Sequence, residues 1–240
     1  MTRIYLAKSG INPKDYEPKE TKTIIENVKK GDIVLDIGAN IGVHTLLLAK
    51  LVGDKGKVYA FEPDPENFRL LKKNIEYNGC SNVILENKAV SDNNGKIKLY
   101  LCKDNTATHR IYKCKGFVSG KFKGNYVEVE CIKLDDYFNN KEKIDFIKID
   151  VEGAEPSVIN GARETIRRNN VKILTEFYPY LISKFGYYYW EYIRDLIELG
   201  FVLSDIEYGE EIIDVYNLLE KVNPEEINYT NLLCIKKDLK

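Results

Sequence analysis

The sequence is poor in metal-binding and membrane-spanning features. Its five cysteines are widely spaced with no C-x-x-C pair, and it has only two histidines, so no structural zinc site is predicted. No apolar run approaches the length of a membrane span, and residues 1–10 lack the apolar core of a signal peptide. Scattered thiols are typical of a reducing compartment. We therefore expect a cytoplasmic protein without a membrane span.

The chain as a whole also has almost no net charge. The 240 residues include 36 Lys and Arg against 37 Asp and Glu, for a formal net charge of −1. This balance removes the protein-wide attraction on which a general nucleic-acid or anionic-membrane binder depends. Hydrophobic residues make up 44% of the chain, which excludes a disordered tail and fits one well-buried domain.

What the sequence does contain is an alternation of short apolar strands with helices. Strands are expected at 33–36, 57–61, 83–85, 144–150, 171–177, 201–203 and 232–235, and helices at 44–51, 66–77, 156–166 and around 190–197. Residues 95–132 instead alternate with a period of two, which indicates half-exposed strands inserted into or beside the main sheet. The prediction is an α/β fold, with a doubly wound, mostly parallel sheet in a single domain over residues 31–240. Residues 1–30 are expected to form an N-terminal cap with a helix near 22–30.

Carboxylates and amides recur where the expected strands end. Ligands of doubly wound sheets bind outside the carboxyl ends of the strands, so these side chains are expected to line one site. The residues at these positions are Asp36, Glu62, Asn87, Asp150, Glu152 and Glu176.

The first turn, residues 36–42, reads Asp-Ile-Gly-Ala-Asn-Ile-Gly. Its two glycines permit close approach of backbone to a ligand, but Asn40 and Val43 replace the second and third glycines of a dinucleotide-binding G-x-G-x-x-G motif. Asp36 suits a ligand ammonium better than a pyrophosphate, and Glu62, placed 26 residues later, can accept both hydroxyls of a ribose. These features predict S-adenosylmethionine; a plain glycine turn with a capping acid is the alternative.

Four segments together resemble the FkbM-type methyltransferases, which are S-adenosylmethionine-dependent enzymes with the Rossmann-like class I fold. They read VLDIGANIGVHT, YAFEPDPENFRLLKKNI, IDFIKIDVEGAEPSVINGA and TEFYP, and the similarity runs from about residue 30 to 180. The most specific part is KIDVEGAE, which class I enzymes in general do not share. The resemblance implies O-methylation of a hydroxyl on a sugar, a glycan or a related small metabolite.

The resemblance also implies roles for individual residues at the cofactor site. The methionine end of S-adenosylmethionine would be held by the first turn, through Asp36, Gly38, Ala39, Asn40 and Gly42. The ribose would be held at the end of the second strand by Glu62 and Pro63, and the adenine after the third strand by Asn87 and Ala89. Asp150 would face both cofactor and acceptor.

Candidates for acid–base work lie in two places. Asp150 can orient or deprotonate an acceptor hydroxyl, with Lys148 in the same segment, and Glu152 is either catalytic or a cap for the helix that starts near Ala154. His109, in the loop 104–110, has a side chain that titrates near neutral pH. The identity of the general base is left open.

Charge is unevenly distributed along the chain. Residues 103–124 carry six Lys or Arg against one acid, and residues 205–226 carry eight acids against one lysine. The basic stretch is either an acceptor lid that favours an anionic sugar or a solvated loop. The acidic stretch is either a solvent face or a partner surface.

Other functions and ligands stay open at this point. An RNA methyltransferase could use the basic stretch and its aromatic residues, although nucleic acid is disfavoured because the fourth strand ends in Asp-Val-Glu-Gly and no RNA-binding module is visible. A nucleotide-binding oxidoreductase is disfavoured by the broken glycine motif. A non-catalytic S-adenosylmethionine-binding protein remains possible. Mg²⁺ bound by Asp150 with Glu176 or Asn87 is compatible with the spacing but not required by it, and the oligomeric state is not predicted.

Overall fold

The strand–helix alternation produces one main sheet in the computed structural model, which describes residues 16–101, 111, 126–139, 141–207, 209–212, 215–219, 221–223 and 228–237. His109 and nearly all of 103–124 lie outside the described residues. The strands of the main sheet are β1 (Ile33–Ile37), β2 (Lys57–Phe61), β3 (Val83–Glu86), β7 (Phe146–Ile149), β8 (Lys172–Phe177), β9 (Phe201–Asp205), β10 (Glu210–Ile212) and β11 (Thr230–Lys236).

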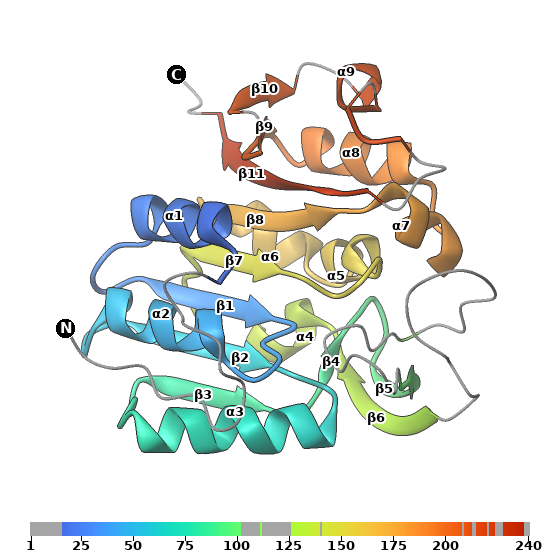
Figure 1. The fold of residues 1–240 in the computed structure, drawn as a ribbon. Helices are drawn as coiled ribbons and strands as arrows, with labels where there is room; N and C mark the ends of the chain where they lie inside the picture. The colour runs from blue at the N-terminus through green and yellow to red at the C-terminus, as the bar shows by residue number, and fades with distance from the viewer. Residues whose placement is uncertain are drawn as a thin grey trace.

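The order across this sheet is β10-β9-β11-β8-β7-β1-β2-β3 (Figure 1). The five strands from β8 to β3 are parallel, whereas β11 runs antiparallel to both β8 and β9. From β1 the chain moves outward through β2 to β3, and from β7 it moves the other way to β8. The direction of winding therefore reverses between β1 and β7, which is where ligands of such sheets bind.

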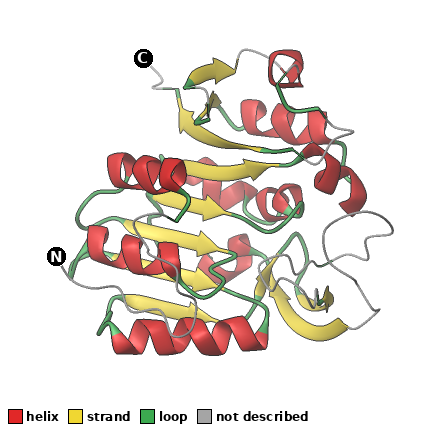
Figure 2. Ribbon diagram, in the orientation of Figure 1, coloured by secondary structure: helices red, strands yellow, loops and turns green. Residues whose placement is uncertain are grey.

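Helices cover both faces of the sheet, giving three layers (Figure 2). On one face, α1 (Pro18–Asn27), α2 (Val43–Val52) and α3 (Pro65–Tyr77) bury apolar side chains such as Ile24, Leu48 and Leu71. The opposite face carries α4 (Leu134–Phe138), α5 (Glu155–Asn160), α6 (Arg163–Arg168) and α8 (Tyr189–Glu198). Two further helices, α7 (Pro179–Phe185) and α9 (Val215–Leu219), follow β8 and β10. No helix among the described residues is long and apolar enough to cross a membrane.

The half-exposed strands predicted within 95–132 lie beside the main sheet and do not enter it. They form a second sheet of order β4-β6-β5, made of β4 (Ala89–Val90), β5 (Gly95–Tyr100) and β6 (Tyr126–Ile132). Its own apolar cluster includes Leu99, Val129 and Cys131, so this sheet has a core of its own.

Two predicted helices differ from the structure. The helix expected over 156–166 is divided into α5 and α6 at Gly161, because that residue packs so tightly on Ser91 that a Cβ there would lie 2.0 Å from the Ser91 carbonyl oxygen. The N-terminal helix runs from Pro18 to Asn27, earlier than the expected 22–30, since proline is well suited to a first helical turn. β10, α4, α7 and α9 were not expected.

Candidate active site

The loop after β1 touches the loop after β7. Gly38 has φ +82°, and a Cβ at this position would lie 1.8 Å from the backbone oxygen of Asp150, so only glycine fits. The backbone N–H groups of Gly38 and Ala39 both donate to the Phe61 carbonyl at 3.0 Å. Asn40, at φ 50°, then turns the chain toward Gly42 and the start of α2. The loop predicted to cradle a ligand is therefore fixed against both neighbouring strands.

Glu62, at the end of β2, is tied to this loop by its side chain. Its carboxylate accepts hydrogen bonds from the backbone N–H groups of Asn40 and Asp64, each at 2.8 Å. Burial raises the pKa of Glu62 to about 8 despite these two donors. Asn87 donates its amide to the Glu62 carbonyl at 2.8 Å and to that of Pro63 at 3.1 Å. The structure thus brings together the residues predicted for the ribose and the adenine, with one exception.

That exception is Ala89. Its side chain is buried in the apolar cluster of the second sheet, so any contact of Ala89 with an adenine would come from its backbone.

Asp36 is the acid predicted to suit a ligand ammonium, and its Oδ1 is buried with no hydrogen-bond partner among the described residues. It has no exposed surface, and its Oδ2 accepts a 2.6 Å hydrogen bond from the Thr45 hydroxyl. In the sheet register Asp36 lies beside Lys148. Burial raises the pKa of Asp36, while Lys148 and Thr45 oppose that rise. The carboxylate lies behind the glycine loop and supports it.

Lys148 and Asp150 form an ion pair at the end of β7. The Lys148 Nζ lies 3.0 Å from the Asp150 Oδ2, with the lysine buried and the Asp150 side chain 35% exposed. Burial lowers the pKa of the Lys148 ammonium, but Asp150, Asp36 and Glu17 raise it more, so its net pKa is above the usual range. Lys148 therefore keeps its proton and holds Asp150 in place, and it does not serve as the proton acceptor.

The turn between β7 and α5 is stabilised by Glu155. Its Oε1 accepts hydrogen bonds from the backbone N–H groups of Val151 and Gly153, at 3.0 and 3.2 Å, and the residue is fully buried. These N–H groups belong to the turn and not to the helix, and the N-cap residue of α5, Ala154, has no side-chain capping hydrogen bond, so the structure does not show the capping role considered for Glu152. Glu152 itself has a left-handed backbone, with φ 57°, in the loop that touches Gly38 through Asp150.

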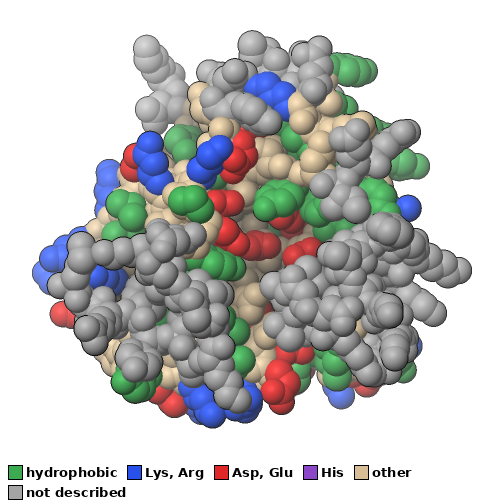
Figure 3. All heavy atoms as spheres, in the orientation of Figure 1, with side chains coloured by type: hydrophobic (Ala, Val, Ile, Leu, Met, Phe, Trp, Pro, Cys, Tyr) green, Lys and Arg blue, Asp and Glu red, His purple; other side chains and the backbone are tan. Residues whose placement is uncertain are grey.

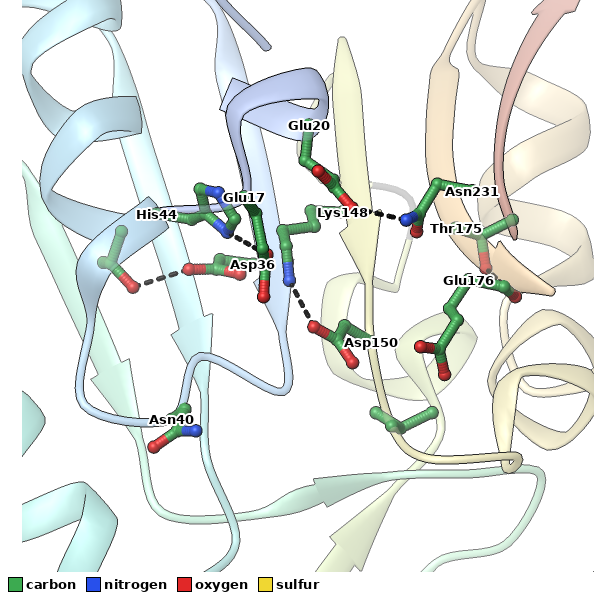
Figure 4. A network of polar contacts seen from close by, with 12 residues as sticks. Glu17, Glu20, Asp36, Asn40, His44, Lys148, Asp150, Thr175, Glu176 and Asn231 are labelled. Atoms are coloured by element: carbon green, nitrogen blue, oxygen red, sulfur yellow. Dashed lines mark hydrogen bonds and ion pairs between the residues drawn. The ribbon is translucent and has the colours of Figure 1, made fainter. Parts of the chain in front are cut away.

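An N-terminal segment contributes residues that the sequence did not single out. Glu17 has a left-handed backbone, with φ 41°, and its Oε2 lies 3.6 Å from the Nδ1 of His44. The ring of Tyr16 packs edge-on against His44, with 5.3 Å between ring centroids. Burial lowers the pKa of His44 well below its usual value, so the imidazole is neutral. Figure 4 shows Glu17 beside the Lys148–Asp150 pair.

The far wall comes from β8 and β11. Side chains two residues apart in a strand share a face, and Lys148 lies beside Leu174, which in turn lies beside Leu233. One face of the sheet therefore displays, near its carboxyl end, Asp36, Lys148, Asp150, Glu176 and Asn231. Asn231 donates to the Glu20 carboxylate, which joins α1 to this wall. In Figure 3 acidic side chains gather in the hollow at the centre of the view.

Glu176 has unused hydrogen-bonding capacity. Its Oε2 atom is buried and has no hydrogen-bond partner among the described residues. Burial raises the pKa of Glu176 well above its usual value, and the nearby carboxylates Asp150, Glu152 and Glu155 add to the effect. No set of three or more His, Cys, Asp or Glu within the described ranges is arranged to hold a metal ion.

This combination of strand order, glycine loop and acid at the end of β2 defines an S-adenosylmethionine-dependent methyltransferase of the class I, Rossmann-like type. The family model described as the methyltransferase FkbM domain matches residues 36–203. The chain belongs to the FkbM methyltransferase family.

Three known proteins illustrate the similarity. The 2-O-methyltransferase NoeI of Sinorhizobium fredii is 30% identical, with 70% of this chain and 72% of NoeI covered. The hexuronic acid methyltransferase AglP of Haloferax volcanii is 26% identical, with 64% of this chain and 59% of AglP covered. The crystal structure of an O-methyltransferase from Thermotoga maritima shares the fold, with a TM-score of 0.52 at 15% identity over 93% of this chain and 66% of that one.

Proposed function

We propose that the protein transfers a methyl group from S-adenosylmethionine to a hydroxyl group of a sugar or glycan. The observation that carries this proposal is the Lys148–Asp150 ion pair at the end of β7, in backbone contact with the glycine loop. It places an oriented carboxylate at the junction between the cofactor loop and the open side of the sheet. The names of NoeI and AglP, which are a 2-O-methyltransferase and a hexuronic acid methyltransferase, support oxygen and sugar as the acceptor.

The residues present fit the cofactor. The loop 38–42 is fixed by its backbone contacts with Asp150 and Phe61, and the Glu62 carboxylate that is bonded to this loop is the group we propose for the ribose hydroxyls. The backbone of Ala39 and Asn40 would hold the methionine end, Pro63 would border the ribose, and Asn87 would face the adenine. When bound, S-adenosylmethionine supplies an electrophilic methyl carbon on its sulfonium.

Asp150 is the proposed proton acceptor. Its carboxylate takes the proton that the acceptor hydroxyl loses as its oxygen is methylated, and Lys148 fixes the orientation of that carboxylate. Glu152 and His109 stay as alternative bases; His109 lies outside the described residues.

The charge of the acceptor is a finer proposal. The described part of the hollow holds several carboxylates and one buried lysine, already paired with Asp150. The group that we propose meets an anionic acceptor is therefore the basic stretch 103–124, nearly all of which lies outside the described residues. Comparing a uronic acid glycoside with its neutral counterpart tests this: a higher KM for the uronic form would contradict an anionic acceptor.

The test of the main proposal is a transfer screen with methyl-labelled S-adenosylmethionine. The substrates are neutral and uronic glycans, lipid-linked sugars and RNA, supplied separately. Label on a sugar oxygen is the expected result. Label on RNA would favour the RNA alternative, and cofactor binding without transfer to any of the substrates would favour a non-catalytic binding protein.

A further inference from the structure

Two tyrosines extend the wall of the candidate site beyond the ends of β8 and β11. These strands are antiparallel and their ladder ends at the pair Thr230 and Phe177; Tyr229 directly precedes β11, and Tyr178 directly follows β8. The two rings lie 5.7 Å apart with a tilt of 33°. Both tyrosines therefore lie at the end of the strand pair that carries Glu176 and Asn231.

The two rings differ in exposure. Tyr178 is 7% exposed and serves as a backing, while Tyr229 is 55% exposed and offers a ring face to solvent. The pKa of the Tyr229 hydroxyl is raised to about 12, first by burial and then by the charges of Glu176, Glu20 and other nearby carboxylates. An exposed aromatic ring therefore borders the carboxylate wall. Tyr229 lies outside residues 36–203, the range of the family match.

An exposed aromatic ring beside a row of carboxylates matches the chemistry of a sugar ring. A pyranose has an apolar face of C–H groups, which packs on an aromatic ring, and a rim of hydroxyls that donate hydrogen bonds. Glu176 supplies the complementary rim, because its buried Oε2 has no partner among the described residues. Recognition of a nucleobase would need both hydrogen-bond donors and acceptors along its edge, whereas the described part of this wall offers chiefly carboxylate oxygens.

Building on the proposed function, we propose that Tyr229, backed by Tyr178, is the platform on which the acceptor's sugar ring stacks. In this arrangement Glu176 binds a ring hydroxyl beside the platform, and the hydroxyl to be methylated is directed toward Asp150. Tyr229 is thus a specificity-determining residue for the acceptor and has no role in holding the cofactor.

The experiment measures binding of simple methyl glycosides, neutral and uronic, in the presence of saturating S-adenosylhomocysteine. Ligand-observed NMR titration of the full chain suits such weak ligands. Tyr229→Ala is expected to weaken glycoside binding by about 10-fold, consistent with the loss of an aromatic contact. Tyr229→Phe keeps the ring and is expected to bind within about 2-fold of wild type. Tyr77→Ala, which removes an exposed tyrosine on α3, is the matched control.

Affinity for S-adenosylhomocysteine serves as the folding check, and every variant is expected to retain it. Glycoside binding by Tyr229→Ala that equals that of wild type would overturn the platform while leaving sugar methylation intact. If wild type binds S-adenosylhomocysteine but none of the glycosides, and methylates a different class of acceptor, the proposed function fails and the platform fails with it. Loss of binding in Tyr229→Ala together with its recovery in Tyr229→Phe supports both.

Discussion

The two halves of the candidate site are built in different ways. We define the cofactor half as residues 36–42, 62–64 and 87, and the acceptor half as the face that carries Lys148, Asp150, Glu176 and Tyr229. In the cofactor half, side chains are occupied by backbone: Glu62 accepts two N–H groups, and the amide of Asn87 donates to two carbonyls. In the acceptor half, by contrast, Lys148 and Asp150 are paired side chain to side chain. A buried carboxyl oxygen without a hydrogen-bond partner among the described residues occurs in both halves, at Asp36 and at Glu176.

This difference shows how specificity is divided in the molecule. A cofactor that never changes is matched by a loop whose geometry is fixed by glycine and by backbone hydrogen bonds. The proposed acceptor half is instead made of side chains at strand ends, of which Tyr229 lies outside the family match. Substitutions confined to one half test this comparison, because each is expected to change the property of that half and leave the property of the other half unchanged.

The largest effect is expected from Asp150→Asn in the acceptor half. Removing the proton acceptor is expected to lower kcat by about 10²–10⁴-fold, while affinity for S-adenosylhomocysteine changes little. Single-turnover methyl transfer and calorimetry measure the two quantities. Asp195→Asn, which alters another partly buried ion pair on α8, is the control and should retain activity. A parallel loss of kcat and cofactor affinity would contradict the division into halves.

In the cofactor half, Gly38→Ala is expected to be the most damaging substitution. The added Cβ meets the Asp150 carbonyl oxygen, so the loop must move, at a cost of about 3 kcal/mol or more in the free energy of unfolding. Gly79→Ala is the matched control. Its backbone is also left-handed but nothing lies within 4 Å, so its cost should be only about 1–2 kcal/mol. Urea unfolding of both variants measures the difference, and equal costs would refute the close approach of the two loops.

A smaller effect is expected from Glu62→Gln. Above pH 8, where Glu62 is ionised, the loss of charged hydrogen bonds to ribose hydroxyls is expected to weaken binding of S-adenosylhomocysteine by about 10–100-fold. Glu66→Gln, on the exposed side of α3, should bind as wild type does. Calorimetric titration of both variants provides the measurement; unchanged affinity in Glu62→Gln would remove this residue from the cofactor site.

The smallest effect is a dependence on pH. The pKa of Glu62 is about 8, and its ionised form accepts ribose hydroxyls, so cofactor affinity should rise toward pH 8 and level off above it. The rise in affinity is at most about tenfold per pH unit for one proton.

The free energy of unfolding of the ligand-free protein should show the opposite trend and fall with rising pH. Because this folded-state pKa is above the unfolded value of about 4.3, the stabilisation is present at low pH and is lost as pH rises through 8. Titration and unfolding of Glu62→Gln should show both slopes reduced; slopes equal to those of wild type would exclude Glu62 as their source.

The sequence was a better guide to the cofactor half than to the acceptor half. The strand at 57–61 and the glycine loop were predicted because each is encoded by consecutive residues with a clear pattern. Glu17 and Tyr229 were missed because each is one polar residue in an unremarkable stretch. Only the packing of α1 and the pairing of β11 with β8 bring them to the site.

Burial was the other property that local sequence did not reveal. The sequence placed Asp36 beside the first turn, but it did not show that the side chain would be fully buried, hydrogen-bonded to Thr45 and next to Lys148. The break at Gly161 likewise depends on Ser91, which is 70 residues away in the chain. Both features come from tertiary contacts that periodicity does not encode.

The position of β11 has a consequence for the order of events during synthesis. It is the last described strand in the chain, yet it inserts between β8 and β9, which have already left the ribosome. The cofactor loop and Glu62 precede it by more than 160 residues, so they can fold first. The pairing of β11 with β8, which brings Tyr229 beside Tyr178, is therefore among the last of the described strand pairings that synthesis makes possible.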